Sequence, residues 1–128
     1  MSPNIVLDAS AVIAFLMQEK GWEQVENKLS NSIISAVNYS EVIAYFIREG
    51  HDPEAVPTLI GDCLPRIIVY DSIHAEISAK LIKKTKSFGL SFGDRACLGL
   101  GIVHTLPVLT ADRAWAKINV GVKILQIR

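Results

Sequence analysis

Short runs of β-branched and other apolar residues alternate with longer helical patterns along all 128 residues of this chain. Such alternation is typical of an α/β domain with a mostly parallel sheet and helices on both faces. The expected strands cover residues 4–8, 32–35, 66–70, 107–110 and 121–127. The expected helices cover residues 9–17, 22–30, 37–48, 52 to about 63, 72–86, 91–104 and 112–117, and Asp52-Pro53 predicts the start of the fourth.

Length and charge limit the class of protein. Half of the 128 residues are hydrophobic, which is enough for one core and too little for two ordinary domains. The 13 basic and 13 acidic side chains cancel, so any nucleic-acid binding would depend on local patches. No apolar run reaches the roughly 18 residues of a membrane span. The first residues lack the basic character of a signal peptide, so a cytoplasmic location is expected.

The two cysteines, Cys63 and Cys97, are too few for a disulfide framework or a zinc ligand set. Free cysteine is among the most frequently buried residue types. We therefore expect both to be small core residues of a protein in a reducing compartment.

Residues 90–101, LSFGDRACLGLG, place a carboxylate on an apolar helix face. In a helical register Asp94 shares its face with Cys97 and Leu98. Burying an ionised carboxylate is unfavourable unless it is paired, hydrogen-bonded or bound to a metal. Ser91 and Asp94 also form the pattern of a capping box. Structural and functional interpretations of Asp94 therefore both apply.

Three further acids stand in apolar surroundings: Asp8 ends the first strand, Asp112 follows the fourth, and Glu41 lies within a helix. Asp8 and Asp112 could instead cap helices, and Arg48 could pair with Glu41. In parallel α/β sheets the ligand crevice lies outside the carboxyl ends of the strands. If the first and fourth strands are neighbours, Asp8 and Asp112 face each other there.

Four carboxylates gathered at one crevice would raise each other's pKa and would call for a cation. Mg²⁺ and Mn²⁺ prefer oxygen ligands, and such an ion activates water and neutralises charge on a phosphoryl group. A carboxylate cluster without histidine therefore indicates phosphodiester hydrolysis rather than peptide hydrolysis.

Four segments carry a resemblance to the PIN-domain family: VLDASAVIAFL, SEV around Glu41, LSFGDRACLGLG and LPVLTAD. Within that family they look most like the VapC ribonuclease toxins of type II toxin–antitoxin modules. The resemblance covers residues 1–128 as a single PIN domain. It implies a five-stranded parallel sheet in the order 3-2-1-4-5, which places the first and fourth strands side by side.

The same resemblance implies an activity and its partners. It implies an endoribonuclease that depends on Mg²⁺ or Mn²⁺, acts on RNA, forms a homodimer and is inhibited by a cognate small antitoxin protein. Thr110 matches the hydroxyl of the T-x-D motif and would orient a carboxylate or a metal-bound water, with Ser10 as a weaker supporting candidate. Catalytic roles carry over to five residues, of which the acids would hold the metal: Asp8, Glu41, Asp94, Asp112 and Thr110.

Some features remain open between function and structure. Arg95 and Arg113 each follow a motif acid and could hold a phosphate or pair structurally. The helix over residues 37–48 is apolar nearly all round, which favours a partner surface. A cluster of four lysines could follow an RNA backbone or complement a helix end: Lys80, Lys83, Lys84 and Lys86.

Three alternatives compete with the toxin interpretation. A PIN nuclease of RNA maturation would share the chemistry without toxicity. A receiver-like Mg²⁺-binding signalling domain would use Asp8 with Asp71 and Lys123, but Leu7 stands where it needs a second acid. An aspartyl phosphotransferase would need an acid at Ser10 to complete its D-x-D motif.

Overall fold

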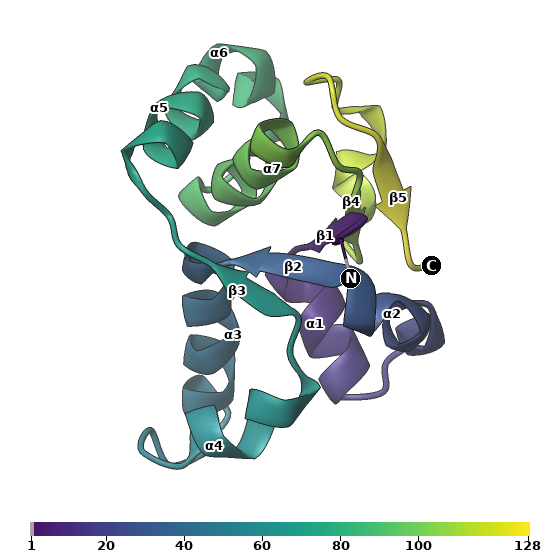
Figure 1. Cartoon of the computed structure of the whole chain (residues 1–128), viewed down its shortest axis with the longest axis vertical. Helices are drawn as coiled ribbons and strands as arrows, with labels where there is room; N and C mark the ends of the chain where they lie inside the picture. The colour runs from purple at the N-terminus through teal and green to yellow at the C-terminus, as the bar shows by residue number, and fades with distance from the viewer. Residues whose placement is uncertain (1) are drawn as a thin grey trace.

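The computed structural model describes residues 2–128 and contains a five-stranded sheet in the order β3-β2-β1-β4-β5 (Figure 1). Every pair of neighbouring strands is parallel. The predicted α/β class, the parallel sheet and its strand order are confirmed. The strands are β1 (Ile5–Leu7), β2 (Ser32–Ser35), β3 (Arg66–Ile68), β4 (Val108–Thr110) and β5 (Ile124–Gln126).

Helices cover both faces of the sheet, as predicted (Figure 1). One face carries α1 (Ala9–Leu16), α2 (Trp22–Lys28), α3 (Ala36–Arg48) and α4 (Val56–Ile60). The other carries α5 (Ser72–Lys80), α6 (Ile82–Thr85) and α7 (Phe92–His104). Short 3-10 turns complete the chain: η1 (Leu29–Asn31), η2 (Gly61–Cys63), η3 (Lys86–Phe88) and η4 (Arg113–Lys117).

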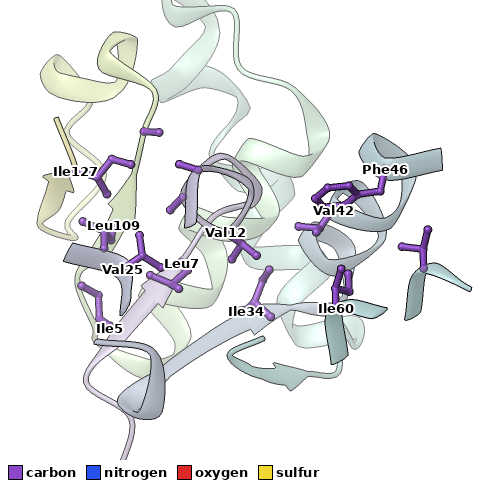
Figure 2. Packing of buried hydrophobic residues seen from close by; sticks show 14 residues of the cluster. Ile5, Leu7, Val12, Val25, Ile34, Val42, Phe46, Ile60, Leu109 and Ile127 are labelled. Carbon is purple, nitrogen blue, oxygen red and sulfur yellow. The ribbon is translucent and has the colours of Figure 1, made fainter. Parts of the chain in front are cut away.

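The sheet separates two hydrophobic clusters, because successive side chains of a strand point to opposite faces. In β1, Ile5 and Leu7 join the cluster beneath α1 to α4, and Val6 joins the cluster beneath α5 to α7. Figure 2 shows the first cluster extending from Ile127 at one end to Phe46 at the other. The central strands are thus buried on both faces, which is why their sequences are continuously apolar.

The fourth predicted helix begins later than the Asp52-Pro53 signal indicated. Asp52 instead begins a turn, in which its carboxylate accepts a hydrogen bond of 3.2 Å from the Glu54 amide. Helix α4 starts at Val56, so that Pro57 falls at the beginning of the helix, where its missing N–H is tolerated. A helix from Pro53 would have placed Pro57 in its interior.

The predicted helix over residues 72–86 is divided into α5 and α6 at Leu81. The Leu81 amide bonds the Ser78 carbonyl at 3.1 Å, a tighter turn than an α-helix has. The break lets Leu81 enter the second cluster, where its side chain is buried.

The expectation that both cysteines lie in the core is correct for Cys97 and wrong for Cys63. Cys97 is buried in α7, whereas Cys63 ends the exposed η2 turn. Within residues 2–128, no helix combines the length and apolar character needed to cross a membrane.

Candidate metal-dependent active site

The four predicted acids line one cleft of about 250 Å³ near the carboxyl ends of β1 and β4. Asp8 follows β1, Asp112 follows β4, Glu41 lies in α3 and Asp94 lies in the first turn of α7. The structure thus brings together the acids that the sequence distributes over four elements. The residues around the cleft are Asp8, Ala9, Ser10, Ile13, Asn38, Glu41, Arg48, Asp94 and Asp112.

Asp8 both caps a helix and lines the cleft. Its carboxylate accepts hydrogen bonds from the Ala11 amide at 2.8 Å and from the Thr110 hydroxyl at 2.5 Å. The Ser10 hydroxyl lies 2.8 and 2.9 Å from its two oxygens. Burial raises the pKa of Asp8 to about 6, these hydrogen bonds oppose the rise, and the nearby Asp94 charge adds to it.

Thr110 and Ser10 join the ends of β1 and β4. Thr110 is fully buried, and its hydroxyl accepts a hydrogen bond of 3.0 Å from the Asp112 amide while donating to Asp8. The Ser10 hydroxyl accepts from the Ala111 amide at 3.0 Å and lies 3.2 Å from the Thr110 hydroxyl. Ser10, only a weak candidate in the sequence, therefore occupies the centre of the network around Asp8.

Asp94 and Asp112 also serve as helix caps. Asp94 and Ser91 form the predicted capping box: the Ser91 amide bonds the Asp94 carboxylate at 3.0 Å, and the Asp94 amide bonds the Ser91 hydroxyl at 3.2 Å. The Asp112 carboxylate accepts from the Ala114 amide at 2.9 Å at the start of η4. Capping fixes both carboxylates at the rim of the cleft.

Glu41 is held by a contact that the sequence analysis missed. The Asn38 amide nitrogen donates to the Glu41 carboxylate at 2.7 Å and to the Gly93 carbonyl at 3.0 Å. A Cβ atom at Gly93 would overlap the Glu41 carboxylate, so the glycine provides the space that Glu41 occupies. The available signal was the position of Asn38, one helical turn before Glu41.

Among the described residues, 2–128, no ion pair neutralises the charge of the acids that line the cleft. Within residues 2–128 the ion pairs are His74 with Asp71 and Arg128 with Glu19, all outside the cleft. The alternative pair of Arg48 with Glu41 does not form, although Arg48 lines the same cleft.

Arg95 and Cys97 follow Asp94 in α7 and lie in different surroundings. Arg95 donates to the Leu90 carbonyl at 2.9 Å, which is a structural contact. Burial raises the pKa of the Cys97 thiol, and the charges of Asp8, Asp94 and Glu41 raise it further.

The donor set fits a hard divalent cation. Across the described residues, 2–128, no three acidic, histidine or cysteine side chains are arranged as a ready-made ligand cage. Mg²⁺ does not require one, because it keeps several waters and takes only one or two carboxylates directly. Uncompensated carboxylates around an open cleft suit such a hydrated ion better than zinc, which favours nitrogen and sulfur ligands.

Two residues of the receiver-like alternative lie elsewhere. Asp71 caps α5, where it accepts from the Ile73 and His74 amides at 3.1 Å. Neither Asp71 nor Lys123 lines the cleft that contains Asp8. The structure therefore does not assemble a receiver site.

This combination of a 3-2-1-4-5 parallel sheet with an acidic cleft defines a known class. The PIN-domain family model matches residues 5–121, and the chain belongs to the PIN-domain family, as its motifs predicted. No curated protein matches the chain in sequence.

Solved structures with the same fold include toxins of toxin–antitoxin systems. DNA-bound VapBC from Salmonella typhimurium has 18% identity and a TM-score of 0.75, over 98% of this chain and 99% of that chain. A toxin–antitoxin complex from Klebsiella pneumoniae has 19% identity and a TM-score of 0.73, over 98% of both chains. The sarcin–ricin loop cleaving toxin VapC20 of Mycobacterium tuberculosis has 14% identity and a TM-score of 0.71, over 94% of this chain and 99% of that chain. At these identities the similarity establishes the fold.

Proposed function

We propose that this PIN domain is a metal-dependent endoribonuclease and the toxin of a toxin–antitoxin pair. The observation that carries the proposal is the cleft lined by Asp8, Glu41, Asp94 and Asp112. Within residues 2–128 these carboxylates have no basic ion-pair partner, so a bound cation would offset their charge and would also attract an anionic phosphodiester.

In this proposal the four acids would hold Mg²⁺ or Mn²⁺. A divalent ion bound there would supply Lewis acidity to activate water and to stabilise negative charge on a phosphoryl group. Thr110 and Ser10 keep the Asp8 carboxylate in one orientation, and the capping box does the same for Asp94. Arg48 provides a positive side chain at the cleft that can contact a substrate phosphate.

Two features support the toxin role and its partners. The similar structures include toxin–antitoxin complexes and a toxin that cleaves the sarcin–ricin loop. Several large apolar side chains are exposed, and where such side chains are contiguous they form a surface suited to a protein partner. We infer a cytoplasmic homodimer that a cognate small antitoxin protein inhibits. Among the exposed side chains are Met17, Ile47, Leu59, Ile67, Val69, Ile73 and Phe92.

The nuclease proposal is tested by cleavage of RNA with Mg²⁺ or Mn²⁺ and with EDTA. We expect cleavage only with the metal, and a loss of at least ~10²-fold in Asp94→Asn, which keeps the shape of the cap but lowers the charge. Asp71→Asn is the matched control, because Asp71 caps α5 outside the cleft. Full activity of Asp94→Asn, in preparations free of contaminating nuclease, would contradict the assignment.

The toxin role needs a separate experiment. We expect expression of the wild-type chain to slow bacterial growth, and co-expression of a small protein encoded beside it to restore growth. Equal growth inhibition by wild type and Asp94→Asn would reject the toxin role. That result would leave the nuclease assignment intact, and a role in RNA maturation would then be favoured over the toxin role.

A further inference from the structure

We propose that Asn38 is a positioning residue that holds the Glu41 carboxylate in its working place; this inference rests on the proposed nuclease function. Asn38 is 2% exposed and lies on α3 between two acceptors of the cleft wall. Its amide nitrogen donates to the Glu41 carboxylate at 2.7 Å and to the Gly93 carbonyl at 3.0 Å.

The two neighbours of the Asn38 amide determine its orientation. Both the Glu41 carboxylate and the Gly93 carbonyl are acceptors, so the amide NH₂ must face them and the amide oxygen must face away. The NH₂ group therefore connects a side chain of α3 to the backbone of α7. Because Gly93 has no side chain, the carboxylate can lie directly against α7.

The other half of the amide has no structural use in the described part of the chain. The Asn38 Oδ1 atom is buried and has no hydrogen-bond partner within residues 2–128. A buried acceptor without a partner is unfavourable, and an apolar side chain of similar shape would avoid it. The NH₂ group of Asn38 donates hydrogen bonds to Glu41 and Gly93, and these two bonds are the role of the amide at this position.

Glu41 depends on this contact. Within residues 2–128, the Glu41 carboxylate accepts hydrogen bonds from one residue, Asn38, whereas the Asp8 carboxylate accepts them from three residues. A glutamate has three rotatable side-chain bonds, so without Asn38 the carboxylate is free to leave Gly93. Residues that orient a metal ligand affect metal affinity or activity by about 10–100-fold.

The test compares Asn38→Leu and Asn38→Asp with Ser40→Ala, an exposed control on the same helix. Leu keeps much of the volume without a donor, and Asp keeps the shape but replaces the donor with an acceptor. We expect Asn38→Leu to lower Mn²⁺ affinity, measured by calorimetry, or kcat by about 10–100-fold, and Asn38→Asp to lower kcat to a similar extent, with KM for RNA nearly unchanged. Wild-type affinity and kcat in both variants would overturn the proposal.

A double-mutant cycle tests whether Asn38 acts through Glu41. In a Glu41→Gln background, Asn38→Leu is expected to lower kcat further by less than about threefold, because the group it positions is already altered. Losses that multiply would mean that Asn38 acts independently, which would also overturn the proposal.

Crystal structures separate this inference from the nuclease function. In Asn38→Leu we expect the Glu41 carboxylate to have moved away from Gly93, and an unmoved carboxylate would overturn the positioning role. This result is independent of whether wild type cleaves RNA. If wild type does not cleave RNA with any divalent metal, the proposed function fails, and the crystal structure still decides what holds Glu41.

Discussion

Thr110 and Asp8 lie 102 residues apart in the chain and are joined by a hydrogen bond of 2.5 Å where β4 and β1 end side by side. The hydroxyl donates to a carboxylate whose charge burial disfavours. The ionised Asp8 carboxylate is therefore unfavourable for the stability of the fold, and the hydrogen bond from Thr110 orients it. Such opposition between stability and function is typical of active sites.

The stability of the metal-free protein is expected to depend on pH through Asp8. Its pKa is raised from 3.8 to about 6 in the folded state, so between these values the folded state binds more protons than the unfolded state. The contribution of Asp8 to stability is therefore full below about pH 4 and is lost as the pH rises through about 6, by about 3 kcal/mol at most. Urea unfolding in EDTA at a series of pH values measures this.

Asp8→Asn is the matched variant, because asparagine still caps α1 but cannot ionise. We expect it to lack this pH dependence and to be as stable as wild type or more stable at pH 7. Mn²⁺ is expected to stabilise wild type by about 2.7 kcal/mol at a hundredfold excess over its Kd, and the variant much less. A variant less stable than wild type in EDTA with an unchanged metal response would show that Asp8 is structural.

Gly93→Ala is expected to impair the site while leaving every acid in the sequence. Alanine favours helices by about 1 kcal/mol over glycine, but its Cβ would overlap the Glu41 carboxylate. We expect RNA cleavage to fall by about 10²-fold, as misplaced catalytic groups typically do. Gly61→Ala is the control, since a Cβ there meets no atom within 4 Å. Equal kcat in the two variants would contradict the close contact.

Arg48→Gln is expected to weaken RNA binding without abolishing the chemistry. Arg48 lines the cleft, and within residues 2–128 it forms no ion pair. We expect KM to rise, kcat to change little, and the slope of log affinity against log salt to shrink by about one, as for the loss of one phosphate contact. Arg66→Gln, at an exposed position in β3, is the control. An unchanged salt slope would show that Arg48 does not contact phosphate.

The two thiols are expected to differ in reactivity. Cys63 is exposed, whereas Cys97 is buried and its pKa is raised by burial and by the acids of the cleft. Because the thiolate is the reactive form, we expect the Cys63 thiol to react rapidly with a disulfide reagent in the folded protein. The Cys97 thiol is expected to react only in denaturant. Two rapid thiols in the folded state would contradict the burial of Cys97.

The fold class could be predicted from the sequence because apolar residues recur with different spacing in its strands and in its helices. Continuous apolar runs such as Ile5–Leu7 give strands buried on both faces, and longer patterns with caps such as Ser91 give helices. The order of strands came from the family resemblance, since the chain alone does not specify neighbours. The late start of α4 and the break at Leu81 depend on Pro57 and on packing, which local signals do not resolve.

The candidate site was predictable as far as its acids. A carboxylate in an apolar segment is conspicuous in a sequence, and Asp8, Glu41 and Asp94 were found in this way. Asn38 was not, because a neutral amide within a helix has many ordinary roles. Its contact with Gly93 joins two helices that are far apart in the chain, and only the folded structure shows it.

The cleft is lined by residues of α3 and α7, which pack on opposite faces of the sheet, and this affects local opening. Glu41 belongs to a helix of one cluster and Asp94 to a helix of the other. A cation bound by both Glu41 and Asp94 would connect the helical layer on one face of the sheet to the layer on the other. Amide hydrogen exchange in the first turns of α3 and α7 would then slow together when metal is added, although the sheet lies between their cores.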